Sequence, residues 1–140
     1  MKRRCSAIAL SSLLTSSLSL AQVACPSASE ISAETLIGAW DVELLTQPPQ
    51  RWPLTLQAHP EHTGSLKGTL WQGAQKALVV ADWDDGEFTM EESQDGQRIA
   101  ATWLGAATEG PCGPQIEGTR QTDAAASAPT RFRMRSRRQP

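Results

Sequence analysis

Hydrophobic and polar residues alternate in short segments along most of the chain after residue 38. Alternation with a period of two is typical of β-strands that bury one face and expose the other. Residues that favour turns separate the segments. The eight segments span residues 39–45, 52–58, 65–71, 77–83, 87–91, 98–104, 115–121 and 131–137. The pattern predicts an all-β fold with almost no helix.

The connections between these segments are mostly short. Asp85-Gly86 and Asp95-Gly96 stand between alternating segments, where an Asp-Gly pair favours a tight hairpin. Successive hairpins favour an up-and-down meander, and closing the meander removes its exposed edges. We predict a single antiparallel up-and-down β-barrel of about eight strands over residues 39–138. In the preceding segment, residues 22–38, Ser32–Leu36 predicts one short helical turn with Ser32 as its N-cap.

The charges of the first and last segments favour closure. If these two segments pair, outward Arg131, Arg133 and Arg135 lie beside outward Asp41 and Glu43. Opposite charges on neighbouring strands attract, whereas a register slip of one residue would turn the arginines into the interior.

The alternation also predicts burial. Residues 77–83 are apolar on both faces, so we expect the most buried strand there. Ile99 aligns with Ala101 and Trp103 and is expected inside the barrel. Gly68 interrupts an alternating segment, which predicts a bend or a close approach of two backbones.

The first 25 residues follow another pattern. Residues 2–4 carry three positive charges, and an uncharged Ala/Leu/Ser stretch follows. This is typical of a secretory signal peptide, which we place over residues 1–21, with cleavage after Ala24 as the alternative. A lipidated Cys25 fits less well, because Gln22 stands where a bacterial lipobox has Leu. No later apolar run reaches membrane-spanning length, and we expect a periplasmic or secreted protein.

Removing this leader changes the cysteine count and the charge. Cys5 is lost, and Cys25 and Cys112 remain in an oxidising compartment, which predicts a disulfide between them. Three cations are also lost, so the formal net charge changes from −2 to −5. This acidic balance argues against a nucleic-acid partner.

Gly38-Ala39-Trp40 follows the expected helical turn and precedes the eight segments. This order resembles the start of a lipocalin or a related calycin-type barrel. In that family a short N-terminal helix closes one barrel end, the Trp lies at the barrel floor, and an Arg of a late strand packs over it. The resemblance implies structural roles for Gly38 and Trp40, and it assigns the Arg role to Arg131 or Arg133.

The resemblance also bears on the disulfide. In such a barrel the connection that holds Cys112 lies at the closed end, where the N-terminal segment with Cys25 also crosses. The chain departs from the family in being shorter than most lipocalins and in lacking a second lipocalin motif.

Small bacterial periplasmic inhibitors of secreted metalloproteases use the same type of barrel, and the start of their first strand is similar to residues 32–40. Their extended N-terminal segment enters the protease cleft. Here Cys25 would anchor that segment, whereas the inhibitors place their cysteines elsewhere. A protease inhibitor is therefore the alternative hypothesis.

Two short motifs offer side chains that could bind a metal. His59-Pro60-Glu61-His62 offers two imidazoles and a carboxylate, but exposed loop histidines commonly hold no metal. Residues 82–86 are similar to a calcium loop, but the glycine comes one residue early and Ser93 takes the place of the final Glu. We predict no metal, no cofactor and no catalytic residues, and so a protein that is not an enzyme.

The chain has five tryptophans and no tyrosine. Trp52, Trp71, Trp83 and Trp103 are candidate ligand-binding residues, because inward tryptophans suit an apolar or ring-shaped ligand. The alternative is that they fill a small eight-stranded interior.

The site of function is expected at the open end of the barrel. The connections over residues 47–51, 72–76, 92–97 and 122–130 gather there, with Trp52 and Trp71 at the rim. The predicted function is an exported binding module whose partner is a small apolar molecule or a periplasmic protein.

Overall fold

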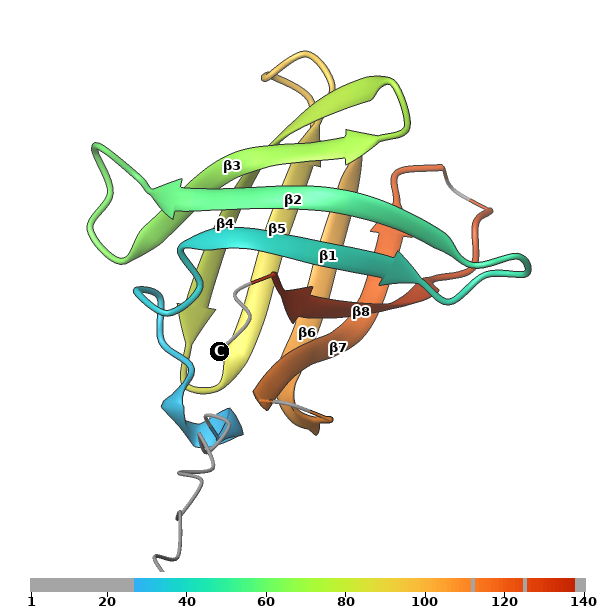
Figure 1. Cartoon of the computed structure of the whole chain (residues 1–140). Coiled ribbons are helices and arrows are strands. Elements are labelled where there is room, and N and C mark those ends of the chain that lie inside the picture. Colours follow the sequence, from blue (N-terminus) through green and yellow to red (C-terminus); the bar gives the residue numbers. More distant parts are fainter. Residues whose placement is uncertain (1–26, 112, 125, 138–140) are drawn as a thin grey trace, which may run out of the picture.

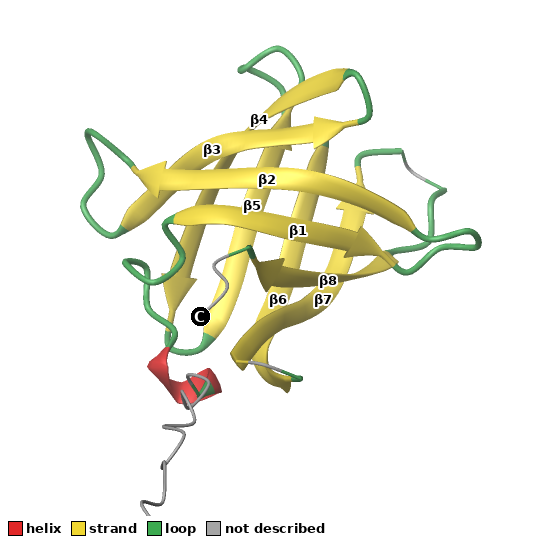
Figure 2. Cartoon of the chain, in the orientation of Figure 1, coloured by secondary structure: helices red, strands yellow, loops and turns green. Residues whose placement is uncertain are grey.

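Eight antiparallel strands form a closed barrel in the computed structural model, which describes residues 27–111, 113–124 and 126–137 (Figure 1). Each strand pairs with the next along the chain, and the last pairs with the first. The strands are β1 (Gly38–Leu44), β2 (Gln50–Ala58), β3 (Ser65–Gln72), β4 (Gln75–Asp84), β5 (Glu87–Ser93), β6 (Ala101–Gly110), β7 (Gly113–Thr122) and β8 (Thr130–Ser136). The rest of the described chain is loops, turns and the 3₁₀ helix η1 (Ala28–Glu30) (Figure 2). The predicted fold class is confirmed.

The register between β1 and β8 is the one that the charges predict. Glu43 lies opposite Arg133, and Asp41 lies opposite Arg135. The short contacts are offset from this register. Arg133 donates to Glu117 of the neighbouring strand β7 at 2.7 Å, and Arg137, two residues after Arg135, donates to Asp41 at 2.6 Å. These charges line the outside of the seam that closes the barrel.

Gly68 and Gly118 lie where neighbouring strands approach closely. A Cβ atom on Gly68 would stand 1.9 Å from the carbonyl oxygen of Thr55, and one on Gly118 would stand 1.9 Å from that of Leu104. No side chain fits at such distances unless the backbone moves. The close approach expected at Gly68 is confirmed, and the similar stretches 66–69 and 116–119 share it.

Two expectations about burial were wrong. On β4 only the inward face is buried, and Leu78 and Val80 are 45% and 42% exposed on the outward face, because no other part of the described chain covers the outside of the barrel there. Ile99 is also exposed and lies before β6. Its loop is held by Asp95, whose carboxylate accepts the backbone N–H groups of Gln97 and Arg98 at 2.8 Å each.

The N-terminal segment covers one end of the barrel. The expected turn consists of a hydrogen bond from Leu36 N–H to Ser32 C=O at 3.1 Å, and Ser32 Oγ accepts the N–H of Thr35 at 3.4 Å. Ile31 and Leu36 are buried in the core. The helix η1 packs against β6 and β7 at the lower left of Figure 1. We call this end the floor.

Several expectations concern residues outside the described ranges. The signal peptide, its cleavage site and both Cys25 and Cys112 lie there. Within the described ranges, no helix is long and apolar enough to cross a membrane.

Candidate functional site

The end opposite the floor is the mouth, where the connections β1–β2, β3–β4, β5–β6 and β7–β8 meet because the closed meander is antiparallel. The second of these is only the turn Gly73-Ala74, and the third runs over residues 94–100. The candidate site has two parts, a polar cluster inside the mouth and an apolar surface outside the barrel.

The G-x-W motif lies at the floor. Gly38 has a φ of 135°, which side chains disfavour, and buried Trp40 donates its indole N–H to the carbonyl of Leu36 at 2.8 Å. Arg131 and Arg133 do not take the role that the resemblance implies. They alternate with inward Phe132 and Met134, and both point outward. Arg131 is exposed, and Arg133 binds Glu117.

The four candidate tryptophans do not converge on one site. Trp103 is fully buried, and its ring centroid lies 6.4 Å from that of half-buried Trp52. Trp83 is half-buried next to the β4–β5 hairpin at the floor end. Trp71 is 43% exposed on the outside of β3 near the mouth. Only Trp52 and Trp103 are brought together.

The inward Trp103 is part of a packed interior. Its ring also meets Phe132 edge-on at 5.0 Å between centroids. Buried aliphatic side chains surround the rings, among them Leu54, Leu56 and Leu70. For Trp52 and Trp103, this arrangement agrees with the interpretation that the tryptophans fill a small eight-stranded barrel, whereas Trp71 lies outside it.

A polar cluster at the mouth includes two of these rings. It consists of Glu92, Arg120, Gln72, Trp103 and Trp52, and we call it the mouth cluster. Arg120 binds Glu92 through two hydrogen bonds of 2.9 and 3.0 Å. Gln72 donates to Glu92 at 2.5 Å and Trp103 donates at 3.1 Å. The Arg120 guanidinium also lies 5.4 Å from the ring centroids of both tryptophans, within the range of a cation–π contact.

Glu92 is 1% exposed and remains a carboxylate in this cluster. Burial alone raises its pKa, but the hydrogen bonds from Arg120, Gln72 and Trp103, together with the charge of Arg120, lower it below the ordinary value of 4.5. Each carboxylate oxygen accepts two of the four hydrogen bonds. The carboxylate is therefore suited to holding strands together rather than to taking a proton from a substrate.

The mouth cluster was not predicted from the sequence. Glu92 was expected in the loop 92–97, and Arg120 was given no role. A signal was present, because Glu92 continues the inward series Phe88 and Met90, and Arg120 is four residues after buried Ile116. Opposite charges at inward positions near strand ends predict a buried ion pair.

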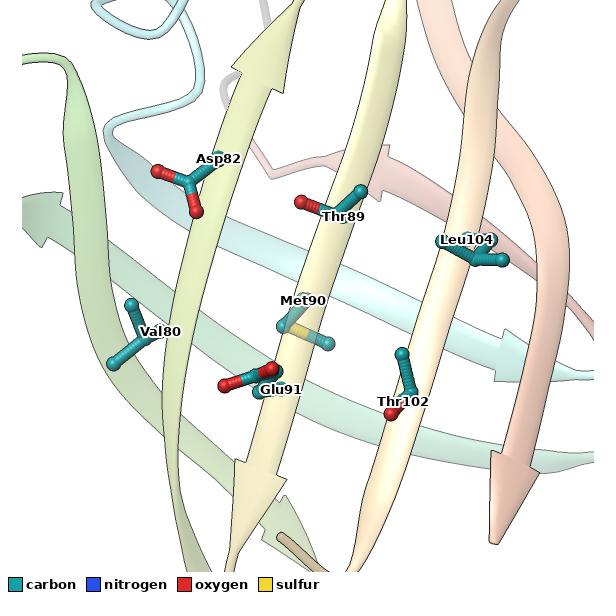
Figure 3. A pocket seen from close by; sticks show the side chains of 7 residues that line it. All are labelled: Val80, Asp82, Thr89, Met90, Glu91, Thr102 and Leu104. Atoms are coloured by element: carbon teal, nitrogen blue, oxygen red, sulfur yellow. The ribbon is translucent and has the colours of Figure 1, made fainter.

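The outside of the barrel carries the second part. The exposed large hydrophobic residues of the described chain all lie between β3 and β6, and we call them the outer patch: Trp71, Leu78, Val80, Ile99 and Leu104. A shallow hollow of about 350 Å³ opens beside Val80 and Leu104 on β4, β5 and β6 (Figure 3). Apolar surface gathered in this way is typical of interaction sites.

Of the two motifs that offer metal ligands, His59–His62 lies in the β2–β3 connection at the floor end, and residues 82–86 begin at Asp82, which lines the hollow. His59 and His62 stack with 4.5 Å between ring centroids, and His59 Nδ1 accepts the N–H of Glu61 at 3.2 Å. Asp85 and Gly86 have φ angles of 45° and 85° and form the predicted hairpin turn. Among the residues that the structure describes, no three His, Cys, Asp or Glu side chains are grouped to hold a metal.

Neither a protein-family model nor a curated protein matches the chain.

Proposed function

We propose that the chain is an exported, non-catalytic binding module that recognises a partner protein through the outside of its barrel. The observation that carries this proposal is the position of its apolar surface. The interior apolar residues are used in packing, whereas those of the outer patch face solvent. Large apolar side chains are costly to leave in water, and a partner that covers them gains that free energy.

A small apolar ligand inside the barrel has less support. Trp52, Trp103 and Phe132 occupy the interior below the mouth with edge-on ring contacts. Glu92 and Arg120 lie above them as a paired, hydrogen-bonded lid. A ligand that entered there would have to separate this ion pair, which costs several kcal/mol, about 3–5, in a buried setting.

The proposed Cys25–Cys112 disulfide has support from nearby described residues. The N–H of Ala28 donates to the carboxylate of Glu109 at 2.7 Å. These residues lie three positions after Cys25 and three positions before Cys112. A disulfide would tie the N-terminal segment to the β6–β7 end that it already contacts.

The alternative, a protease inhibitor that inserts its N-terminal segment, would have to use residues before Ser27. Residues 27–37 are engaged by the barrel, since Ile31 and Leu36 are buried and Ala28 binds Glu109. No specific observation on the described residues favours this alternative over a binding role of the outer patch.

Two measurements on the exported protein test the proposal. Nile red, an uncharged dye that fluoresces on apolar surfaces, should brighten with the wild type and less with Trp71→Thr/Leu104→Thr. Arg131→Thr on the opposite face is the matched control and should leave the signal unchanged. Native mass spectrometry should give the mass of the polypeptide alone.

A small molecule bound inside the barrel would contradict the proposal. A co-purified small molecule that the outer variant retains and a Trp52→Ala variant loses would place the site inside the mouth, and the proposal would be wrong.

A further inference from the structure

The hollow in the outer patch combines apolar walls with carboxylates. Its outward side chains form two rows across β4, β5 and β6 (Figure 3). One row is Asp82, Thr89 and Leu104, and the other is Val80, Glu91 and Thr102. The short threonines leave space between the longer side chains. The result is a recess with aliphatic walls at two corners and carboxylates beside them.

The two carboxylates are near one another. Asp82 lies opposite Thr89, and Glu91 is two residues further along β5 on the same face. Diagonal neighbours of this kind are roughly 7–8 Å apart at their backbones, and their side chains reach closer. Asp84 and Glu87 are exposed and pair with each other one step towards the hairpin, so the acidic surface extends beyond the hollow.

These carboxylates have no cation of their own. The ion pairs within 4 Å in the described part of the chain use Glu43, Glu92, Glu117 and Asp41, and not Asp82 or Glu91. Asp82 accepts a hydrogen bond from the hydroxyl of Ser65. Lys67 lies opposite Val80 and is in none of these pairs. The acidic side chains on the β1–β8 seam, in contrast, each have an arginine.

We propose that this hollow receives a lysine or arginine side chain of the partner protein, from a segment that also covers Trp71 and Leu78. The inference rests on the proposed function and names the chemistry of the partner. The aliphatic stem of a basic side chain fits against Val80 and Leu104, while its cation meets the carboxylates of Asp82 and Glu91. Trp71, which is exposed on β3 opposite Lys76 of β4, is of the residue type that often dominates binding energy.

A peptide probe tests the charge requirement. The ¹⁵N-labelled exported chain is titrated with acetyl-Leu-Arg-Leu-Arg-Leu-amide and with the same peptide carrying citrulline, which keeps the shape of arginine without its charge. The arginine peptide should shift the amide signals of β4, β5 and β6 around the hollow, and the citrulline peptide should bind roughly tenfold more weakly. Added salt should weaken only the arginine peptide.

Matched variants locate the effect. Asp82→Asn/Glu91→Gln should reduce affinity for the arginine peptide by about tenfold. Glu61→Gln/Asp123→Asn removes two exposed charges from loops outside the patch and should leave the affinity unchanged. Equal changes in both variants would mean an effect of net charge only and would overturn the inference.

The remaining outcomes separate the two proposals. Equal binding of both peptides, binding of neither, or signals that shift on β7 and β8 would overturn the basic-side-chain inference. The outer-patch function would still stand if the Nile red test had succeeded. Loss of the Nile red effect, together with a small molecule in the mouth, would overturn the function itself.

Discussion

The mouth cluster and the outer patch depart from the usual distribution of residues in opposite directions. The mouth cluster holds a carboxylate and a guanidinium inside the barrel, where apolar residues are expected. The outer patch holds large apolar side chains outside it, where polar residues are expected. The two lie at the same half of the molecule, since Gln72 of the cluster is the neighbour of Trp71 of the patch.

The difference between them is whether their groups have partners. Both carboxylate oxygens of Glu92 accept hydrogen bonds, and the donors are Arg120, Gln72 and Trp103. The apolar atoms of Leu104 and Val80 face water. Buried charged groups that find all their partners within the chain are explained by folding. Exposed apolar groups that no other part of the described chain covers are explained by a binding partner.

Removing the cation from the mouth cluster should have the largest effect. Arg120→Ala leaves Glu92 buried without its ion pair and should lower the free energy of unfolding by about 3–5 kcal/mol. Urea denaturation at neutral pH measures it. Arg131→Ala, which removes an exposed arginine, should cost no more than about 0.5 kcal/mol. Similar small values for both would mean that the cluster does not stabilise the barrel.

Two matched tryptophan substitutions test whether the charge of Glu92 strengthens its hydrogen bond from Trp103. Trp103→Phe removes an N–H donor to a carboxylate, worth about 1.5–3 kcal/mol, whereas Trp40→Phe removes one to a carbonyl, worth about 0.5–1.5 kcal/mol. Both changes remove the same ring volume from a buried position. Denaturation should therefore show the larger loss for Trp103→Phe, and equal losses would contradict a charge-assisted bond.

Acid should weaken the mouth cluster. Because the pKa of Glu92 is lowered on folding, its contribution is complete above the ordinary value of 4.5 and is lost as the pH falls through the lower, folded pKa. The unfolding free energy of the wild type should fall below pH 4.5 more steeply than that of Glu92→Leu/Arg120→Leu. Asp95 and Glu30, whose pKa values are also lowered by backbone hydrogen bonds, are present in both proteins and cancel.

The outer patch should matter least for stability. Leu104→Thr keeps a residue that favours strands and should change the unfolding free energy by no more than about 0.5 kcal/mol. Leu70→Thr, at a fully buried position, is the matched control and should cost about 2–5 kcal/mol. If Leu104→Thr were as destabilising as Leu70→Thr, the patch would be part of the fold and not a surface for a partner.

Much of the fold was predictable from local pattern. Phe132 and Met134 alternate with arginines, and that alternation assigned the faces of β8 and its register against β1. Trp52 was correctly expected near the mouth. The candidate site was not found as a whole, because β5 was ended at Glu91 and Glu92 was assigned to a loop.

The sequence by itself determined the eight strands, their order and the side of each strand that faces inward, because a period of two is a property of neighbouring residues. Tertiary structure alone decided which polar residues are compensated. Glu92 meets Arg120 across 28 positions of the chain, and no local pattern carries that distance. It also decided that Leu78 and Val80 remain outside, because an apolar side chain is buried only where another layer covers it, and the described chain supplies none on that face.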